Sequence, residues 1–177
     1  SIGAVCGVTL PNDISLRHPF ERGFVLGCCN INFSRAIPYI WDNILNFEDG
    51  TLRVNLLLNR ASQWADVDSY IPYEGRVDVK IKQTCVLSVR IPEWVASEDT
   101  YATVNGESRE PTWDDRYALI GKVKTADMVT LTFPISERTI KETMGYPYAV
   151  DYTLVIKGNT VVFVDPPGKH NPFYQRD

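Results

Sequence analysis

Cysteine, histidine and methionine are scarce in this chain. Its 177 residues include four cysteines, two histidines and two methionines. Four cysteines at this length are too few for the disulfide framework of a small secreted domain. His18 and His170 stand in no arrangement with serine that is typical of a catalytic triad. A glycine-rich loop that could cradle phosphate is absent as well.

Long apolar runs and clusters of basic residues are missing too. No stretch approaches the roughly 20 apolar residues that a membrane-spanning helix needs. The opening residues 1–5 lack the basic segment of a signal peptide. The formal net charge is −4, and Lys and Arg form no run or stripe. The sequence therefore predicts neither a membrane nor a nucleic-acid partner.

What the sequence does contain begins with an amphipathic pattern. Apolar residues recur at three- and four-residue steps, which predicts a helix over about residues 30–47 that ends at Asp49-Gly50. Pro38 lies inside this helix, and an interior proline costs about 3 kcal/mol. We therefore expect the helix either to start near Ser34 or to bend. Its apolar face consists of Phe33, Ile37, Ile40, Trp41, Ile44 and Leu45.

After Gly50 the hydrophobic period changes from about 3.6 to 2, which is typical of half-buried strands. Asn105-Gly106 predicts a hairpin turn, and residues 157–159 predict another. The fold class we predict is mainly β: an antiparallel, jelly-roll-like β-sandwich preceded by one or two helices. The alternating segments are residues 52–58, 77–82, 85–91, 129–133, 152–156 and 161–164.

The order of these segments is lopsided. A helix with a broad apolar face normally packs on other helices or on a sheet, and an irregular arm and one such helix precede a self-sufficient sandwich. We therefore expect the chain to be the carboxyl-terminal piece of a larger protein. Residues 1–49 would be the end of a helical domain, and residues 50–177 would be the β-sandwich domain.

The adjacent thiols of Cys28 and Cys29 are the main candidates for chemistry. Neighbouring cysteines rarely bridge to each other, and amides at a helix start lower the pKa of a thiol. Such a thiol is a metal ligand or a nucleophile. Zinc favours four ligands, and Cys6 with His18 or Glu21 could complete a set, although the spacing fits no short zinc motif. The alternative is that the pair is merely packed.

The remaining candidates have plainer interpretations. Free cysteine is most often a small buried hydrophobe, which is our prediction for Cys85 and the favoured one for Cys6. The carboxylates that could form a glycosidase pair are more simply surface charges. Aromatic residues are dense between 64 and 117, where core packing is favoured over a sugar platform. The carboxylates are Asp66, Asp68, Glu74, Glu93, Asp114 and Asp115, and the aromatics are Trp64, Tyr70, Tyr73, Trp94, Tyr101, Trp113 and Tyr117.

Several short motifs follow one another along the chain: Cys28-Cys29 with Asn32 and Arg35, Asp49-Gly50, Val54-Asn55-Leu56, Val89 to Trp94, and Val104-Asn105-Gly106. Their order resembles that in the β-L-arabinofuranosidase-type glycoside hydrolases, long catalogued as a domain of unknown function. The resemblance covers about residues 27–134, and the segment 158–176 resembles a distinctive branch of that family. The cysteine pair and the Arg-Ile-Pro-Glu-Trp segment are the more specific motifs.

The resemblance implies a division of labour. In the family an amino-terminal (α/α)₆ barrel carries the active site, and β-sandwich domains follow. By that resemblance Cys28 would be the nucleophile of a retaining hydrolase and a zinc ligand, and Cys29 a second zinc ligand. A Glu and a Cys upstream would complete the zinc site, and another upstream Glu would be the acid/base. The sugar substrate and the upstream barrel would be the partners.

The chain departs from this pattern, because the acid/base Glu and the upstream Glu-x-Cys ligands have no match in it. We therefore expect the chain alone to be inactive and to lack zinc. Free thiols favour the cytoplasm, but a chain that begins at Ser1 instead of Met leaves secretion open. The sequence also leaves open a different class, a non-catalytic carbohydrate-binding module, for which the dense aromatics argue.

Overall fold

The protein is described by a computed structural model that covers residues 27–144 and 149–167, and the side chains within these ranges except those of residues 27–31 and 144. The chain divides into two compact units. One unit holds the described residues 40–136 together with the turn 157–159. The other holds the described residues 27–39, 137–156 and 160–167. No described helix is both long and apolar enough to span a membrane.

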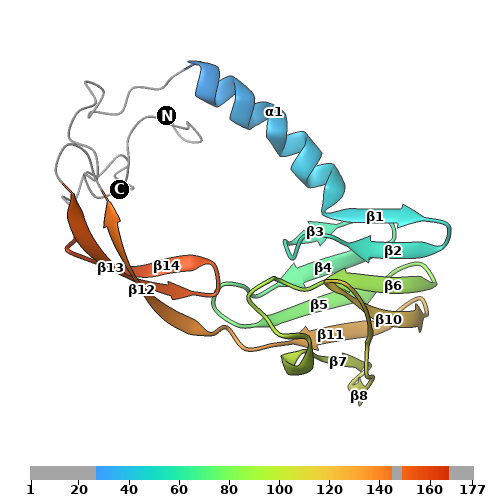
Figure 1. Ribbon diagram of the computed structural model, residues 1–177. Coiled ribbons are helices and arrows are strands. Elements are labelled where there is room, and N and C mark those ends of the chain that lie inside the picture. Colours follow the sequence, from blue (N-terminus) through green and yellow to red (C-terminus); the bar gives the residue numbers. More distant parts are fainter. Residues whose placement is uncertain (1–26, 145–148, 168–177) are drawn as a thin grey trace, which may run out of the picture. The chain divides into compact units, whose positions relative to one another are not determined.

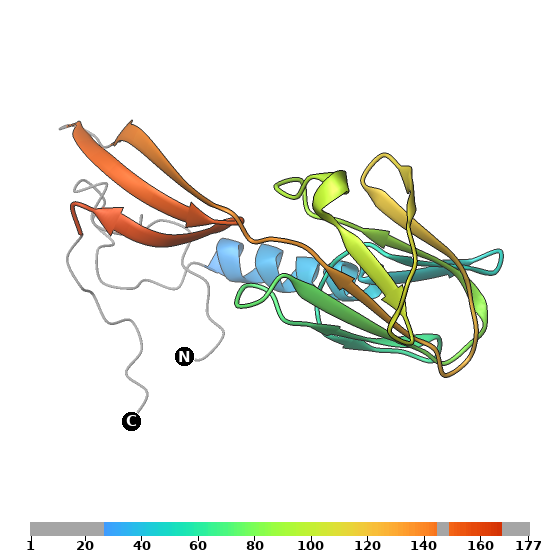
Figure 2. The same cartoon turned by 90° about the horizontal axis from the view of Figure 1, so that it is seen from below.

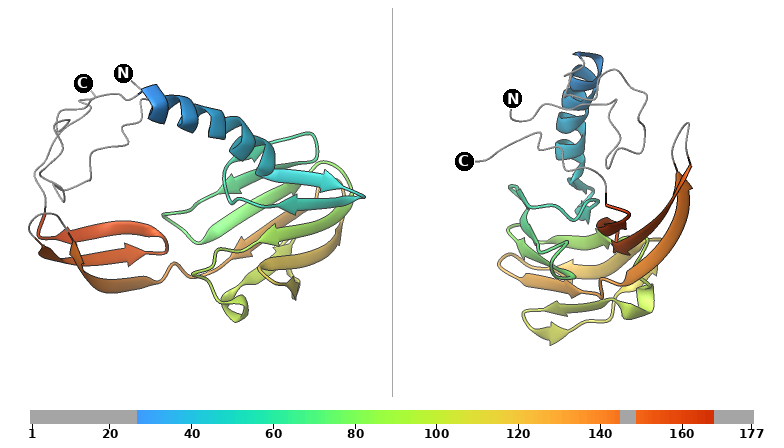
Figure 3. Two further views of the ribbon diagram at one scale, coloured as in Figure 1. Left: turned by 45° about the horizontal axis from the view of Figure 1, so that its top comes forward. Right: turned by 90° about the vertical axis from the view of Figure 1, so that its left-hand side faces the viewer.

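The helix α1 covers Gly27–Asn43, with Pro38 inside it. Figure 3 shows α1 in blue as one uninterrupted coil that leads into β1. The predicted alternative of a start near Ser34 is therefore wrong. The predicted end is also wrong, because Ile44 and Leu45 are buried in the sandwich core, and Leu45 begins a strand.

The unit 40–136 is a β-sandwich of two sheets, labelled in Figure 1 and seen from below in Figure 2. One sheet has the order β1-β2-β6-β10-β9, and the other has the order β3-β4-β5-β11-β7-β8. A short 3₁₀ helix, Ser97–Asp99, precedes β7. The strands are β1 Leu45–Glu48, β2 Thr51–Val54, β3 Arg60–Ala61, β4 Ala65–Ser69, β5 Arg76–Ile81, β6 Cys85–Arg90, β7 Tyr101–Val104, β8 Glu107–Ser108, β9 Thr112–Asp114, β10 Tyr117–Val123 and β11 Met128–Thr132.

The turns follow from residues that tolerate positive φ. Asp49 and Gly50 have φ values of 48° and 76° and join β1 to β2. Asp-Gly is a preferred pair for a two-residue hairpin turn, so this pair links two strands instead of ending a helix, which corrects our prediction. Asn105 and Gly106 join β7 to β8 with φ values of 53° and 83°, as predicted.

The predicted antiparallel sandwich is confirmed, except that one pair of neighbouring strands is parallel. Strand β2 pairs with β6 in parallel, with Leu52 opposite Leu87 and Val54 opposite Val89. The jelly-roll connectivity in our prediction is not confirmed by this strand order. Leu56 and Leu58, which the alternation placed in a strand, lie beyond the end of β2.

The core lies between the two sheets, because every second residue of each long strand points inward. Val77, Val79 and Ile81 of β5 and Leu87 and Val89 of β6 are at most 1% exposed. These residues form one hydrophobic cluster with inward residues of β2, β4, β7, β10 and β11. The alternation read from the sequence therefore identifies the buried face correctly in these strands.

The other unit contains a three-stranded sheet, drawn in orange to red in Figure 3. Its order is β12-β13-β14, with β12 Glu137–Met144, β13 Val150–Lys157 and β14 Thr160–Asp165. The turn at Gly158, with φ of 60°, confirms the second predicted hairpin. The predicted division into residues 1–49 and 50–177 concerns domains of a longer protein, which contacts within this chain do not test.

Candidate functional site

Cys28 and Cys29 lie in the first turn of the described helix α1, where the sequence placed them. Their side chains lie outside the described part, as do Cys6, His18 and Glu21. Their ionisation and ligand roles therefore stay predictions. Among the residues that the structure describes, no group of three or more His, Cys, Asp or Glu side chains is placed to hold a metal.

The carboxyl end of α1 is tied to the sandwich through Asn55, which directly follows β2. The Asn55 side chain donates from Nδ2 to the carbonyl of Asn43, the last residue of α1, at 3.1 Å. Its Oδ1 accepts from the Tyr117 hydroxyl at 2.8 Å, and its main-chain N–H donates to the carbonyl of Ile44 at 2.9 Å. Terminal helix carbonyls need such donors, so Asn55 closes the helix end and links it to β10.

A second contact holds the last turn of the same helix. The Arg60 guanidinium lies over the Trp41 ring, 3.9 Å from the ring centroid. A guanidinium over an indole face is the favourable cation–π arrangement. Trp41 comes from α1 and Arg60 from β3, so the helix end is held from both sheets of the sandwich.

The Arg-Ile-Pro-Glu-Trp motif folds into a loop that Arg116 stabilises. Arg116 donates to the main-chain carbonyls of Ile91, Pro92 and Val95. A planar guanidinium with several fixed donors suits this task better than an ammonium group. Behind the loop, the Trp94 ring meets the Phe133 ring edge to face at 5.9 Å. The motif therefore builds structure at the end of β6.

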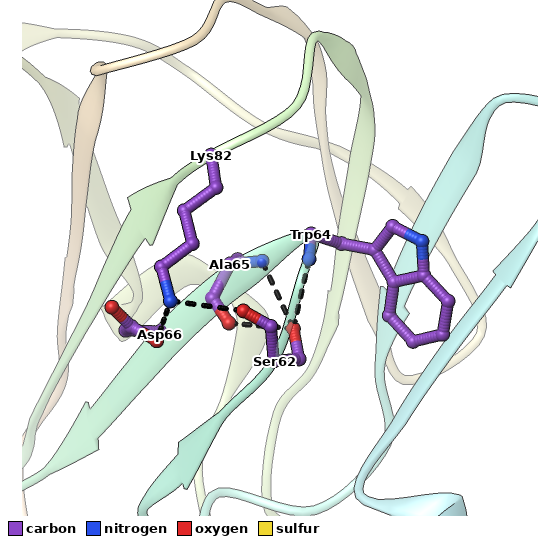
Figure 4. A network of polar contacts seen from close by, with 5 residues as sticks. All are labelled: Ser62, Trp64, Ala65, Asp66 and Lys82. Carbon is purple, nitrogen blue, oxygen red and sulfur yellow. Dashed lines mark hydrogen bonds and ion pairs between the residues drawn. The ribbon is translucent and has the colours of Figure 1, made fainter.

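The carboxylates that we considered as a glycosidase pair lie in several surface positions. Asp66 is half-buried, and the other five are exposed. Lys82 forms an ion pair with Asp66 at 2.5 Å and donates to the carbonyl of Ser62 at 2.9 Å (Figure 4). Figure 4 also shows the Trp64 ring pointing away from this pair. The ring stacks on Phe47 at 5.6 Å.

The buried carboxylate of the sandwich is one that the sequence did not single out. Asp78 on β5 is 7% exposed although it points to the outer face of its sheet. Arg76 donates to both of its oxygens, at 3.1 Å and 2.6 Å, and the Thr130 hydroxyl donates at 2.7 Å. The Arg76 guanidinium also lies 4.7 Å from the centroid of the Tyr70 ring.

These contacts decide the charge state of Asp78. Burial raises its pKa, but the hydrogen bonds from Arg76 and Thr130 and the charge of Arg76 outweigh burial, so the pKa of Asp78 is lowered. The hydrogen bond and charge of Asp78 raise the pKa of Arg76 in turn. The pair is therefore ionised near neutral pH and is no candidate for a general acid.

Cys85 is a buried side chain, as predicted. It is 4% exposed in the core, and burial raises the pKa of its thiol. A thiol with a raised pKa is a poor nucleophile and a poor metal ligand. The described part of the chain therefore leaves the pair on α1 as the candidate for thiol chemistry.

The aromatic residues divide into two groups. Trp64, Trp94 and Trp113 are partly buried and pack on the core, as favoured. Tyr70, Tyr73 and Tyr101 are 39%, 91% and 66% exposed, contrary to that prediction. Tyr101 shares the outer face of its sheet with Arg76, because both lie opposite Thr132.

Comparison with known proteins shows which sequence family the sandwich is similar to. Residues 51–135 match the sequence model described as the β-L-arabinofuranosidase, GH127 middle domain. No curated protein sequence matches the chain significantly. The matched segment runs from β2 to just beyond β11, which is most of the sandwich.

Solved structures share the fold. One is a GH127 β-L-arabinofuranosidase from Geobacillus stearothermophilus T6, with 23% identity over 80% of this chain and a TM-score of 0.57. Another is a GH127 β-arabinofuranosidase, with 22% identity over 78% of this chain and a TM-score of 0.61. A third, described as a glycoside hydrolase, has 23% identity over 82% and a TM-score of 0.62.

This chain spans only about a quarter of those proteins, covering 24%, 26% and 27% of their lengths. The matched segment contains the Val54-Asn55, Arg-Ile-Pro-Glu-Trp and Asn105-Gly106 motifs that carried the resemblance in the sequence. The sequence model and the solved structures of the same fold therefore point to the same group of proteins as the order of those motifs. Residues 51–135 are therefore similar to the GH127 middle domain of the β-L-arabinofuranosidases, and the chain is consistent with a fragment of that family.

Proposed function

We propose that this chain is an accessory β-sandwich region of a glycoside hydrolase that acts on L-arabinofuranosides or related sugars. The match of residues 51–135 to the GH127 middle domain carries this proposal. In this proposal the sandwich also fixes the end of α1, the helix that begins with the cysteine pair. The hydrogen bond from Asn55 to Asn43 at the end of that helix supports this role.

The two cysteines would supply chemistry to the parent enzyme. Cys28 would attack the anomeric carbon of the sugar, and an acid outside the matched segment would protonate the departing oxygen. Attack followed by hydrolysis gives retention of configuration. Thiolates are soft donors that zinc prefers, so the donor chemistry of Cys28 and Cys29 fits a zinc site. Bound zinc would keep the thiols deprotonated.

Two donors do not complete the four ligands of zinc. The proposal therefore assigns the remaining ligands and the acid/base residue to an upstream (α/α)₆ barrel of the same protein. In this division, residues 1–49 belong to the end of that barrel and residues 50–177 to the sandwich region. The chain by itself would neither retain zinc nor hydrolyse a glycoside.

Activity of the intact parent protein tests the nucleophile. Hydrolysis of an aryl L-arabinofuranoside is measured for the wild type, for Cys28→Ser and for the matched thiol control Cys85→Ala. We expect Cys28→Ser to lose at least about a hundredfold in kcat/KM, since a serine hydroxyl at its ordinary pKa is a much weaker nucleophile. Cys85→Ala should keep the activity as long as it stays folded. Equal activity of the wild type and Cys28→Ser would remove the nucleophile role.

Metal analysis of the same purified proteins tests the zinc assignment separately. We expect about one zinc per parent chain in the wild type, and loss of zinc in Cys29→Ser with the circular dichroism spectrum unchanged. Full zinc content in Cys29→Ser would show that this side chain is packed and not a ligand.

A further inference from the structure

The outer face of the six-stranded sheet carries a row of side chains that the proposed function does not use. In the register of this sheet, Thr132 of β11 lies opposite Arg76 of β5 on one side and opposite Tyr101 of β7 on the other. The inward neighbours Val77, Leu131 and Ala102 are buried. Because side chains alternate along a strand, Arg76, Thr132 and Tyr101 point together to the outer face.

The row continues beyond Arg76 to two further tyrosines. Tyr70 follows β4 directly, its main-chain N–H donates to the Arg76 carbonyl at 3.0 Å, and its ring lies beside the Arg76 guanidinium. Tyr73 is in the same turn, where its N–H donates to the Tyr70 carbonyl at 3.0 Å. We call Tyr70, Tyr73, Arg76, Thr132 and Tyr101 the tyrosine row.

The rings of the tyrosine row are accessible. Tyr73 is 91% exposed, Tyr101 66% and Tyr70 39%. Large aromatic side chains usually bury most of their surface, so three exposed rings at one end of one sheet are unusual. The sheet beneath supplies their spacing, because neighbouring strands lie about 4.8 Å apart.

The polar groups within the row are fixed in place. Asp78 holds Arg76 through two hydrogen bonds, and Thr130 holds Asp78 from the neighbouring strand. The guanidinium in turn contacts the Tyr70 ring. A surface whose side chains are held before binding loses less conformational entropy when a ligand binds.

We propose that the tyrosine row binds oligosaccharides that contain L-arabinofuranosyl units. The apolar faces of Tyr101 and Tyr70 would stack on the C–H faces of sugar rings, since a tyrosine combines an apolar body with a polar tip. Arg76 and Thr132 between them would hydrogen-bond to sugar hydroxyls. Two strand spacings, about 10 Å, separate Arg76 from Tyr101, which is longer than one sugar ring and calls for an oligosaccharide.

The chemistry of the row favours a neutral sugar over other ligands. An anion such as phosphate would find one guanidinium that Asp78 already neutralises. Tyrosine and arginine are also common in protein interfaces, but the buried centre of such an interface is apolar. The outer-face positions beside these rings are instead Thr103, Thr130 and Thr132. The choice of L-arabinofuranosyl units rests on the proposed function, whereas the location of the row does not.

Binding is measured by isothermal titration of the 177-residue chain with L-arabinofuranosyl oligosaccharides of one to four units, and with gluco-oligosaccharides of the same lengths. We expect millimolar or tighter binding that strengthens from one unit to three. Tyr101→Ala should weaken it about tenfold, the loss of one stacking contact. Tyr101→Phe, which keeps the ring, and Val86→Ala on the other sheet should bind as the wild type does.

Circular dichroism of each variant checks that it is folded, and Tyr70→Ala provides a second test of the row. No binding of any arabinofuranosyl probe at 10 mM or so, or binding that neither tyrosine variant weakens, would overturn the proposal. Stronger binding of the gluco-oligosaccharides would overturn the choice of sugar. Loss of the Cys28 role in the parent enzyme would leave these binding results unchanged, so failure of the proposed function is separable from failure of this inference.

Discussion

The Asn55 side chain joins the last residue of α1 to the sandwich, donating from Nδ2 to the carbonyl of Asn43 at 3.1 Å while its Oδ1 accepts from the Tyr117 hydroxyl at 2.8 Å. The side-chain amide of Asn55, which directly follows β2, therefore connects the end of α1 to Tyr117, the first residue of β10. A donor and an acceptor at fixed positions require asparagine, because neither aspartate nor leucine offers both.

We predict that Asn55→Ala lowers the free energy of unfolding by about 1–2 kcal/mol, since it removes two side-chain hydrogen bonds and leaves the Tyr117 hydroxyl without its acceptor. Urea unfolding measures the change. Asn46→Ala, at an exposed position of β1, is the matched control and should stay within about 0.5 kcal/mol of the wild type.

A double-mutant cycle with Tyr117→Phe tests whether the two side chains act together. We expect Asn55→Ala and Tyr117→Phe to be non-additive by at least about 0.5 kcal/mol. Simple additivity of the two changes would contradict a direct hydrogen bond that contributes to stability.

The position of Asn55 shows how far sequence reasoning reaches. The Val54-Asn55-Leu56 motif was recognisable as a family feature, but the role of Asn55 depends on Tyr117, which lies 62 residues away. The two-residue period of β5, β6 and β11 needs no such partner, because alternation is a local property of a strand. The sandwich and its inward faces were therefore predictable, and the polar links between strands were not.

The end of α1 was mispredicted for a related reason. Ile44 and Leu45 continue the three- and four-residue spacing of the helix, yet both are buried in the sandwich core. A short apolar pair fits a helix face and a strand equally well. Asp49-Gly50 contained the deciding signal, because Asp-Gly favours a hairpin turn and needs strands on both sides.

The lowered pKa of Asp78 predicts that the stability of the fold depends on pH in the acid range. This pKa is lowered in the folded state, so the unfolded state binds more protons at acid pH and stability rises with pH. The contribution of Asp78 is fully present above its unfolded pKa, near 3.9, and is lost as the pH falls through the lower folded pKa. We therefore expect the free energy of unfolding of the wild type to fall below about pH 4.

Asp78→Asn should flatten this fall and should cost about 1–3 kcal/mol at pH 7, because Arg76 loses its charged acceptor. Urea unfolding at several pH values between 2 and 7 measures both effects. Asp68→Asn is the matched control, since Asp68 is exposed and lies opposite Asp78 on β4. An unchanged acid slope in Asp78→Asn would contradict the lowered pKa.

Asp78 itself had no signal in the sequence. It alternates with Val77 and Val79 in β5 as any solvent-facing residue would. Its burial comes from Arg76 beside it and from Thr130, which lies 52 residues away and reaches it across the β5–β11 pair. The exposure of Tyr101 was mispredicted in the same way, because an aromatic in a strand does not reveal which face is covered.

The contacts of Arg116 with the loop that follows β6 are expected to contribute to the stability of the fold. We expect Arg116→Lys to lower the free energy of unfolding by about 1–3 kcal/mol, because a lysine cannot reach three main-chain carbonyls that a guanidinium serves together. Thermal unfolding followed by Trp fluorescence would also report the loop, since Trp94 lies within it. Arg109→Lys, which affects one exposed hydrogen bond to the carbonyl of Lys122, should change the stability by less than about 0.5 kcal/mol.

Gly75 and Gly50 occupy positions that favour glycine for two different physical reasons: lack of space for a Cβ at Gly75 and a positive φ at Gly50. A Cβ on Gly75 would lie 1.8 Å from the carbonyl oxygen of Phe133, so the backbone of one of them must move. The same residues are joined by the Phe133 N–H, which donates to the Gly75 carbonyl at 2.9 Å. A Cβ on Gly50 meets nothing within 4 Å, but Gly50 has a φ of +76°.

We therefore predict that Gly75→Ala costs at least about 3 kcal/mol, in the range of severe steric changes. Gly50→Ala should cost only about 1–2 kcal/mol, the strain of a left-handed alanine. Urea unfolding of the two variants side by side measures the difference. Because Gly75 directly precedes β5 and the Tyr70–Tyr73 turn lies beside it, Gly75→Ala should also weaken oligosaccharide binding, whereas Gly50→Ala should not. Equal stability of the two variants would contradict the close approach of Gly75 to Phe133.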